Sequence, residues 1–208
     1  MSKSELRRVA DELAERQWDK EVIAKRVQKL MREGIPRTIQ GKLRISGRRE
    51  DILERVVTRA QEYNLILKNC AQGTALALLE EFGVGNMEVI KALTHFPGIG
   101  GTGNMCGGVT GGLVALGLFL ANDNLLDVET NGATMPTAQK FIAAFEDEVG
   151  FLYCADIQEV IFGVNMDPGA GEERMRAFAS AKGFEKCGAP PGVGARIAAE
   201  LILDSLGA

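Results

Sequence analysis

The chain has 208 residues, of which 46% are hydrophobic and 25% are charged, and this composition is typical of a globular protein rather than a disordered or fibrous one. Its net charge of −4 excludes a strong overall attraction to nucleic acid or to anionic membranes. A chain of this length can form one domain with a substantial core, with or without a small appendage.

Charge is unevenly distributed along the chain. Residues 1–50 carry 14 Lys and Arg against 8 Asp and Glu, whereas the remainder carries 10 against 20. This asymmetry predicts a basic N-terminal helical extension, residues 1–47, followed by a main domain, residues 48–208. The chain starts without an apolar signal segment, and its most apolar stretch, 109–121, is too short to cross a membrane. We therefore expect a cytoplasmic protein without membrane contact.

The extension is predicted to form two helices. Apolar residues recur at helical spacing across 6–13, and Asp19 is a candidate N-cap for a second helix with apolar residues from 22 to 31. Gly34 and Pro36 end this second helix. A basic connector follows, with room for a short extended piece at 43–45.

The main domain is predicted to consist of helices alone. A long helical pattern covers 49–82, with a break expected near 64–69, where helix propensity falls. Asn86 is expected to cap a short helix, and a glycine-dense loop follows over 95–105. Further helices are expected over 107–121, 137–149, 157–161, 172–181 and 193–206, with a polar connector over 123–135. The predicted fold class is all-α, a compact multi-helix bundle.

Four cysteines are spread along the main domain: Cys70, Cys106, Cys154 and Cys187. No two of them form the Cys-x-x-Cys pair typical of zinc ribbons, and on spacing alone four scattered, buried thiols are the simpler interpretation. Each cysteine, however, lies near a predicted helix start, where the helix dipole stabilises negative charge and lowers the pKa of a thiol. In a reducing compartment, such thiols favour metal or redox chemistry over structural disulfides.

Glycines are concentrated before and after Cys106. Gly100, Gly101, Gly103 and Gly107 would let backbone N–H groups approach a bulky anion closely. Sulfide and thiolate sulfurs accept such hydrogen bonds, which tune the reduction potential of a cluster. A nucleotide-binding loop is excluded, because the glycines follow no predicted strand and no Gly-Lys-Ser/Thr is present.

Three other polar features have alternative interpretations. Asn69 lies next to Cys70 and is a candidate either for a hydrogen bond to a sulfur or for a helix cap. His95, the only histidine, could be a proton donor or ligand, or could bond a carbonyl at a helix end. The basic residues of the extension could form a nucleic-acid patch, but interleaved acidic residues and few aromatics favour a solvated or docking face.

Two segments and the two downstream cysteines form a specific pattern: Asn69-Cys70-Ala71-Gln72 precedes the glycine loop, and Cys106-Gly107-Gly108-Val109-Thr110-Gly111 follows it. This pattern resembles the C-GCAxxG-C-C family, which is defined by four invariant cysteines and a Cys-Gly-Ala-x-x-Gly motif and is regarded as redox-active. The resemblance covers roughly residues 55–205 and says nothing of the first 50. Gly108 replaces the alanine of the motif, which is expected to loosen the start of that helix.

The resemblance implies that Cys70, Cys106, Cys154 and Cys187 hold an iron–sulfur cluster, 2Fe-2S or 4Fe-4S, which exchanges electrons with a partner protein. Catalytic residues are left open. Two alternatives remain: an enzyme with an open iron acting as a Lewis acid on a small substrate, and a metal-free thiol–disulfide exchanger. A homodimer is expected, because the N-terminal helices need a surface to pack against, and a nucleic-acid partner is not expected.

Overall fold

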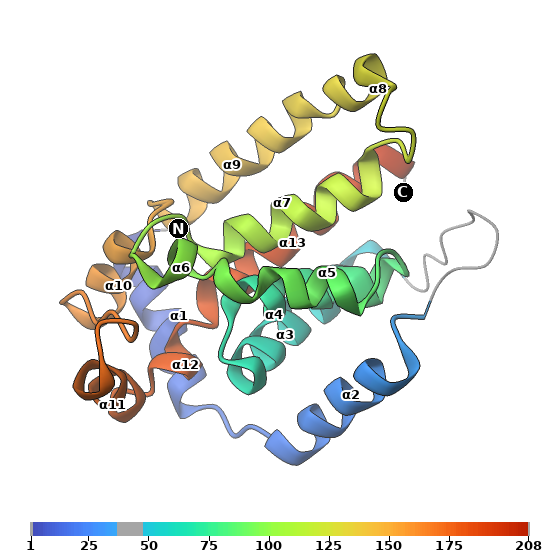
Figure 1. Cartoon of the computed structure of the whole chain (residues 1–208). Helices are drawn as coiled ribbons and strands as arrows, with labels where there is room; N and C mark the ends of the chain where they lie inside the picture. Colours follow the sequence, from blue (N-terminus) through green and yellow to red (C-terminus); the bar gives the residue numbers. More distant parts are fainter. Residues whose placement is uncertain (1, 37–47, 208) are drawn as a thin grey trace.

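The computed structural model describes residues 2–36 and 48–207. Within these ranges the secondary structure is helical and contains no strand; Met105 and Tyr153 form an isolated antiparallel bridge. The all-α prediction is therefore confirmed (Figure 1). The extended piece expected at 43–45 lies outside the described residues.

The helices follow the predicted order. The N-terminal extension contains α1 (Lys3–Glu15) and α2 (Lys20–Glu33). The main domain contains α3 (Arg49–Leu67), α4 (Cys70–Phe82), α5 (Met87–Ala92), the 3-10 helix η2 (Leu93–His95), α6 (Gly98–Gly101), α7 (Gly107–Leu120), α8 (Val128–Gly132), α9 (Met135–Val149), α10 (Cys154–Phe162), α11 (Glu172–Ser180), α12 (Gly183–Lys186) and α13 (Ala189–Leu206). The structure differs from expectation in α8, which interrupts the polar connector, in the short helices α6 and α12, which lie in segments without a predicted helix, and in the earlier starts of α10 and α13.

Local chemistry explains the break between α3 and α4. Lys68 takes a left-handed conformation with a φ of 53°, which ends α3. The side chain of Asn69 then caps α4 by accepting a hydrogen bond from the backbone N–H of Gln72 at 3.0 Å. Asn86 caps α5 in the same way. Both caps follow the sequence prediction, because they depend only on residues within one helical turn.

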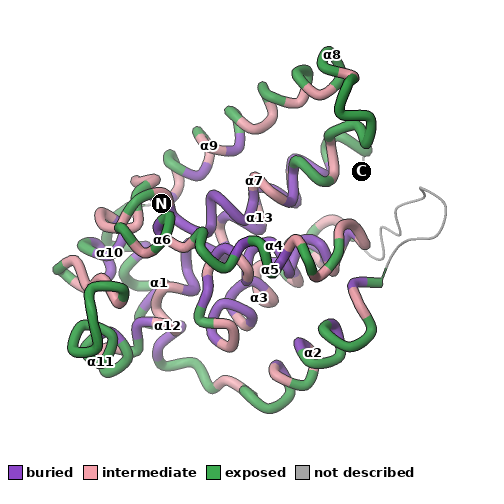
Figure 2. Tube along the Cα trace, in the orientation of Figure 1, coloured by how far each residue is buried: buried purple, intermediate pink, exposed green. Residues whose placement is uncertain are grey.

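The centre of the molecule is formed by α3, α4, α7 and α13, which pack against one another. Figure 2 shows that buried residues are concentrated in these helices. The ring of Phe141, from α9, is fully buried, as are Tyr63, Leu76 and Ile202 of the central helices. The removal of these apolar side chains from water is the main source of stability for such a bundle.

Glycines allow α7 to approach its neighbours at backbone distance. A Cβ on Gly111 would lie 2.3 Å from the carbonyl oxygen of Ala71 in α4, closer than a side chain tolerates. Gly108 is buried against α13, and a Cβ there would lie 2.8 Å from the carbonyl oxygen of Pro190. Glycine at position 108 therefore permits close packing of α7 on α13, and the expected loosening of the start of α7 stays a prediction.

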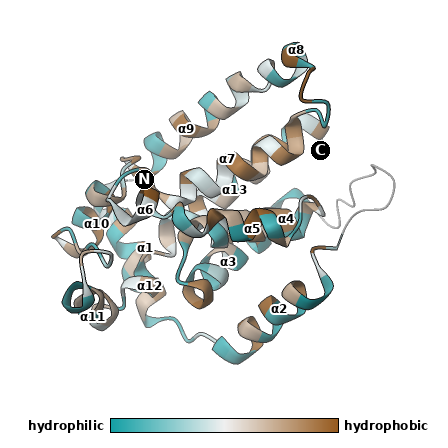
Figure 3. Cartoon of the chain, viewed as in Figure 1, coloured by the Kyte–Doolittle hydropathy of each residue, from teal (hydrophilic) through white to brown (hydrophobic). Residues whose placement is uncertain are grey.

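The N-terminal helices share the core of the main domain. Helix α1 packs against α10, α12 and α13, and α2 packs against α3. The buried residues of α2 are Ile23, Val27 and Leu30, and Figure 3 shows hydrophobic residues alternating with hydrophilic ones along this helix. The hydrophobic face of α2 is thus covered by the protein itself, as its amphipathic pattern predicts.

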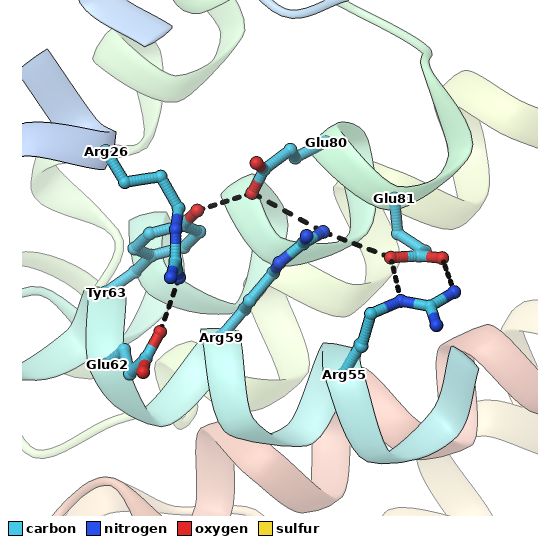
Figure 4. Close-up of polar contacts among 7 residues, drawn as sticks. All are labelled: Arg26, Arg55, Arg59, Glu62, Tyr63, Glu80 and Glu81. Carbon is cyan, nitrogen blue, oxygen red and sulfur yellow. Dashed lines mark hydrogen bonds and ion pairs between the residues drawn. The ribbon is translucent and has the colours of Figure 1, made fainter. Parts of the chain in front are cut away.

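A polar network also ties α2 to α3 and α4 (Figure 4). Arg26 of α2 pairs with Glu62 at 2.6 Å, and the buried hydroxyl of the neighbouring Tyr63 donates a hydrogen bond to Glu80 of α4. Arg55 and Arg59 pair with Glu81, which is nearly buried.

No helix among the described residues is long and apolar enough to cross a membrane.

Candidate functional site

Each of the four cysteines lies at or beside the start of a helix. Cys70 is the first residue of α4, and Cys154 is the first residue of α10. Cys106 immediately precedes α7, and Cys187 follows α12 and lies two residues before α13. All four are free thiols. The predicted placement of the cysteines at helix starts is confirmed.

Folding brings these thiols together from distant parts of the chain. The Cys106 sulfur is within electrostatic reach of the other three, and the Cys187 sulfur is within reach of those of Cys70 and Cys154. Two backbone hydrogen bonds, both 2.8 Å long, align the segments that contain Cys106 and Cys154: one joins Cys106 N–H to Leu152, and the other joins Cys154 N–H to Asn104. Packing of α7 on α4 and α13 brings the remaining helix starts to the same region.

Three of the cysteines border one cavity of about 100 Å³. A single water molecule needs only about 10–15 Å³ of such space, so the cavity can admit a group of several atoms. Its wall is formed by Asn64, Lys68, Cys70, Pro97, Gly98, Gly101, Gly103, Cys154, Gln158, Asp167, Pro168, Phe178, Phe184 and Cys187. Cys106 does not line this cavity and is buried, with 5% of its surface exposed.

The glycine loop forms one side of the cavity. Gly101 and Gly103 line it and have φ values of 74° and 76°, which are accessible to glycine at little cost. Gly100 also has a positive φ but is exposed and does not line the cavity. Ile99 has a φ of 49°, an unfavourable conformation for a β-branched residue that only surrounding structure can maintain.

Gly107 joins two of the thiol-bearing helix starts. A Cβ at this position would lie 2.2 Å from the sulfur of Cys70 and 2.6 Å from the backbone nitrogen of Ala71. Burial raises the pKa of Cys70 and of Cys106, and the backbone N–H groups of Gly107 and Ala71 at Cys70, and of Gly108 at Cys106, act in the opposite direction. The close backbone approach expected of glycine in this segment therefore occurs at the sulfurs themselves.

Two further sequence candidates, Asn69 and His95, also lie away from the cavity wall. The side-chain oxygen of Asn69 accepts from Gln72 N–H, and its Nδ2 donates to the carbonyl oxygen of Thr94 at 3.1 Å. Both ends of this amide therefore position α4 against η2. His95 lies at the end of η2, where it is exposed.

Several residues of the cavity wall have no counterpart among the sequence candidates. Gln158 lies four residues after Cys154 in the same helix, so helical spacing could have indicated their contact. Lys68 directly follows α3, and its ammonium group lies 5.2 Å from the centre of the Phe184 ring. Asp167 comes from an irregular segment, and no local pattern in the sequence places it near a cysteine.

Burial controls the protonation of the thiols. Loss of hydration raises the pKa of Cys70 to about 11 and that of Cys154 to about 12, and it raises the pKa values of Cys106 and Cys187 well above the usual value. Nearby backbone amides lower the pKa of Cys70, but burial outweighs them. The expectation that helix starts produce low-pKa thiols is therefore wrong for the protein with nothing bound.

Fold and site together define an all-helical protein in which four free thiols converge, three of them beside a cavity. A family model with the description "Putative redox-active protein (C_GCAxxG_C_C)" matches residues 68–201, and the chain belongs to this family. The match excludes α1 and α2 and includes all four cysteines. Searches of curated proteins and of solved structures gave no match.

A single metal ion and a cluster place different demands on the donor side chains. Within residues 2–36 and 48–207, no three His, Cys, Asp or Glu side chains form a group that could hold a metal ion. An iron–sulfur cluster has different requirements, because its cysteine ligands are distributed over several iron atoms. Four free thiols, a cavity beside three of them and backbone amides that favour negative charge on two sulfurs fit such a cluster.

Proposed function

We propose that this protein binds an iron–sulfur cluster through Cys70, Cys106, Cys154 and Cys187 and exchanges electrons with a partner protein. The observation that carries the proposal is the convergence of four free thiols from four separate helix starts, three of them beside one cavity. The redox description of the family supports the same function. When bound, the cluster would supply electron-transfer chemistry.

The chain's own groups would serve this cofactor in two ways. The backbone amides of Gly107, Ala71 and Gly108 stabilise negative charge on two of the sulfurs, which thiolate ligation requires. Since burial keeps the thiols protonated, ligation must release protons. We therefore expect cluster assembly to become more favourable as pH rises.

The decisive experiment is the iron and acid-labile sulfide content of protein purified and reconstituted without oxygen. We expect both elements together with visible charge-transfer absorption. Serine substitution of each cysteine should lower the iron content, whereas Met105→Leu, which removes a sulfur next to Cys106, should leave it unchanged. Protein that contains neither iron nor sulfide after reconstitution would contradict the proposal.

An enzyme with one open iron is the second candidate. The observation that favours it is the cavity wall, where three cysteines occur together with polar side chains, including Lys68 and Asp167. A small hydroxyl- or carboxylate-bearing substrate could bind against this wall, beside the metal. Small carboxylates added to the reconstituted protein should then change its visible spectrum.

A metal-free thiol exchanger is disfavoured, because exchange needs thiolates and burial disfavours them here.

A further inference from the structure

A buried amide side chain contacts one of the proposed ligands. Gln158 lies one helical turn after Cys154, and its Nε2 is 3.5 Å from the Cys154 sulfur. Only 5% of Gln158 is exposed, and the residue lines the cavity beside the thiols. A polar group so deeply buried is costly unless its hydrogen-bonding capacity is used.

The backbone N–H of Met166 determines which end of this amide faces the sulfur. It donates a hydrogen bond of 2.9 Å to Oε1 of Gln158. With the amide flipped, two donors would face each other at this contact, so the oxygen must point to Met166 and Nε2 to Cys154. The segment that contains Met166 is itself held in place, because the N–H of Asp167 donates to the side chain of Asn165 at 3.1 Å.

The surroundings of Cys154 differ from those of Cys70. At Cys70, backbone amides at the junction of α4 and α7 favour negative charge on the sulfur. At Cys154, the neighbouring Cys70 and Asp167 oppose negative charge on the sulfur, and the side chain of Gln158 favours it. Gln158 therefore supplies at Cys154 the kind of stabilisation that the backbone supplies at Cys70.

We propose that Gln158 is a positioning residue that orients the Cys154 sulfur for ligation and raises the reduction potential of the centre by donating a hydrogen bond to it. The inference rests on the proposed cluster. Reduction adds negative charge to the cluster and its sulfurs, and a hydrogen-bond donor stabilises the more negative state. Loss of the donor should therefore make the centre harder to reduce.

Two substitutions separate the roles of the amide. Gln158→Glu keeps an oxygen for Met166 N–H but replaces the donor at the sulfur with an acceptor, and Gln158→Leu removes both polar groups at similar size. In anoxic redox titrations of the cluster-loaded protein, with soluble mediators and a chemical reductant, both variants should have more negative midpoint potentials than the parent protein. The shift should be larger for the Glu variant.

Gln72→Glu is the matched control. It introduces the same change of charge two residues after Cys70, but the Gln72 amide donates to the oxygens of Ile90 and Thr94 rather than to a sulfur. Its midpoint potential should change much less than that of Gln158→Glu. Equal shifts in the two Glu variants, or an unchanged potential in Gln158→Leu, would overturn the inference. If the Glu variant does not fold, as judged by circular dichroism, the midpoint potential of Gln158→Leu alone tests the inference.

A second measurement keeps this inference separate from the proposed function. Iron and sulfide content of the parent protein tests the cluster first. In cluster-free protein, peptide mass spectrometry then measures the rates at which Cys154 and Cys70 are alkylated. We expect Gln158→Glu to slow alkylation of Cys154 several-fold and to leave Cys70 nearly unchanged. Equal Cys154 rates in variant and parent would refute the contact, whether or not a cluster binds.

Discussion

At Gly107, a single hydrogen in place of a side chain allows two thiol-bearing helix starts to meet. A Cβ there would lie 2.2 Å from the Cys70 sulfur, and this overlap can be relieved only by moving α7 away from α4. We expect Gly107→Ala to lower the free energy of unfolding by about 1–3 kcal/mol, the usual range for overpacking, and to reduce iron content. Urea unfolding and iron analysis provide the measurements.

Gly117 offers the control for this substitution within the same helix. A Cβ on Gly117 would meet no atom within 4 Å. Gly117→Ala should therefore stabilise the protein by about 0.5–1 kcal/mol, because alanine is the better helix former. If both alanine variants behaved alike, the close contact between Gly107 and Cys70 would not exist in solution.

Thiol burial also predicts a pH dependence of stability. In the folded, cluster-free protein the pKa of Cys70 is about 11 and that of Cys154 is about 12, whereas an unfolded cysteine titrates near 8.5. Above about pH 8.5 the unfolded chain loses protons that the folded chain keeps. The free energy of unfolding must therefore fall as pH rises, by at most about 1.4 kcal/mol per pH unit for each thiol.

Urea unfolding of cluster-free protein between about pH 7 and about pH 10 checks this pH dependence. Cys154→Ser replaces a titrating thiol with a hydroxyl, so the loss of stability with pH should be shallower in this variant. A free energy of unfolding that stayed constant or increased over this range would contradict the proposed burial of the thiols.

At the scale of helices, the cap of α4 couples local structure to the site. Asn69 holds the start of this helix, and Cys70 is its first residue. We expect Asn69→Ala to cost about 1 kcal/mol of stability and also to lower iron content, because the first turn is no longer held against η2. Asn86→Ala removes the equivalent cap of α5 and should cost about the same stability with iron content unchanged. Equal iron contents in the two variants would show that Asn69 has no role beyond capping.

Helix boundaries were predictable where the signal is local. The caps at Asn69 and Asn86 act within one turn, and the helical pattern predicted to end at 82 agrees with the end of α4 at Phe82. The predicted start of α13, residue 193, lies after its observed start at Ala189. Pro190 and Pro191 are typical of loops, but in α13 they lie in the first turn, where a backbone N–H has no partner within the helix. Helix α12 is too short to show a periodic pattern.

At the scale of the whole molecule, the N-terminal helices are part of the core. Leu6 of α1 is fully buried. Leu6→Ala should lower the free energy of unfolding by about 2–5 kcal/mol. Val22→Ala in α2, at a side chain that is 51% exposed, should change it by no more than about 0.5 kcal/mol. A small effect at Leu6 would indicate that α1 does not pack on the main domain in solution.

The homodimer expected from the sequence stays a prediction.

The sequence by itself determined the all-helical class, the four cysteines at helix starts and the glycines that let backbone amides approach them. These properties follow from side-chain periodicity and capping, which act over a few neighbouring residues. Only the tertiary structure decided that the four thiols come together, that Asp167 joins Cys154 at one cavity, and that the thiol pKa values rise rather than fall. Convergence depends on how α4, α7, α10 and α13 pack, and desolvation depends on every atom that surrounds a sulfur, so neither can be derived from short-range patterns.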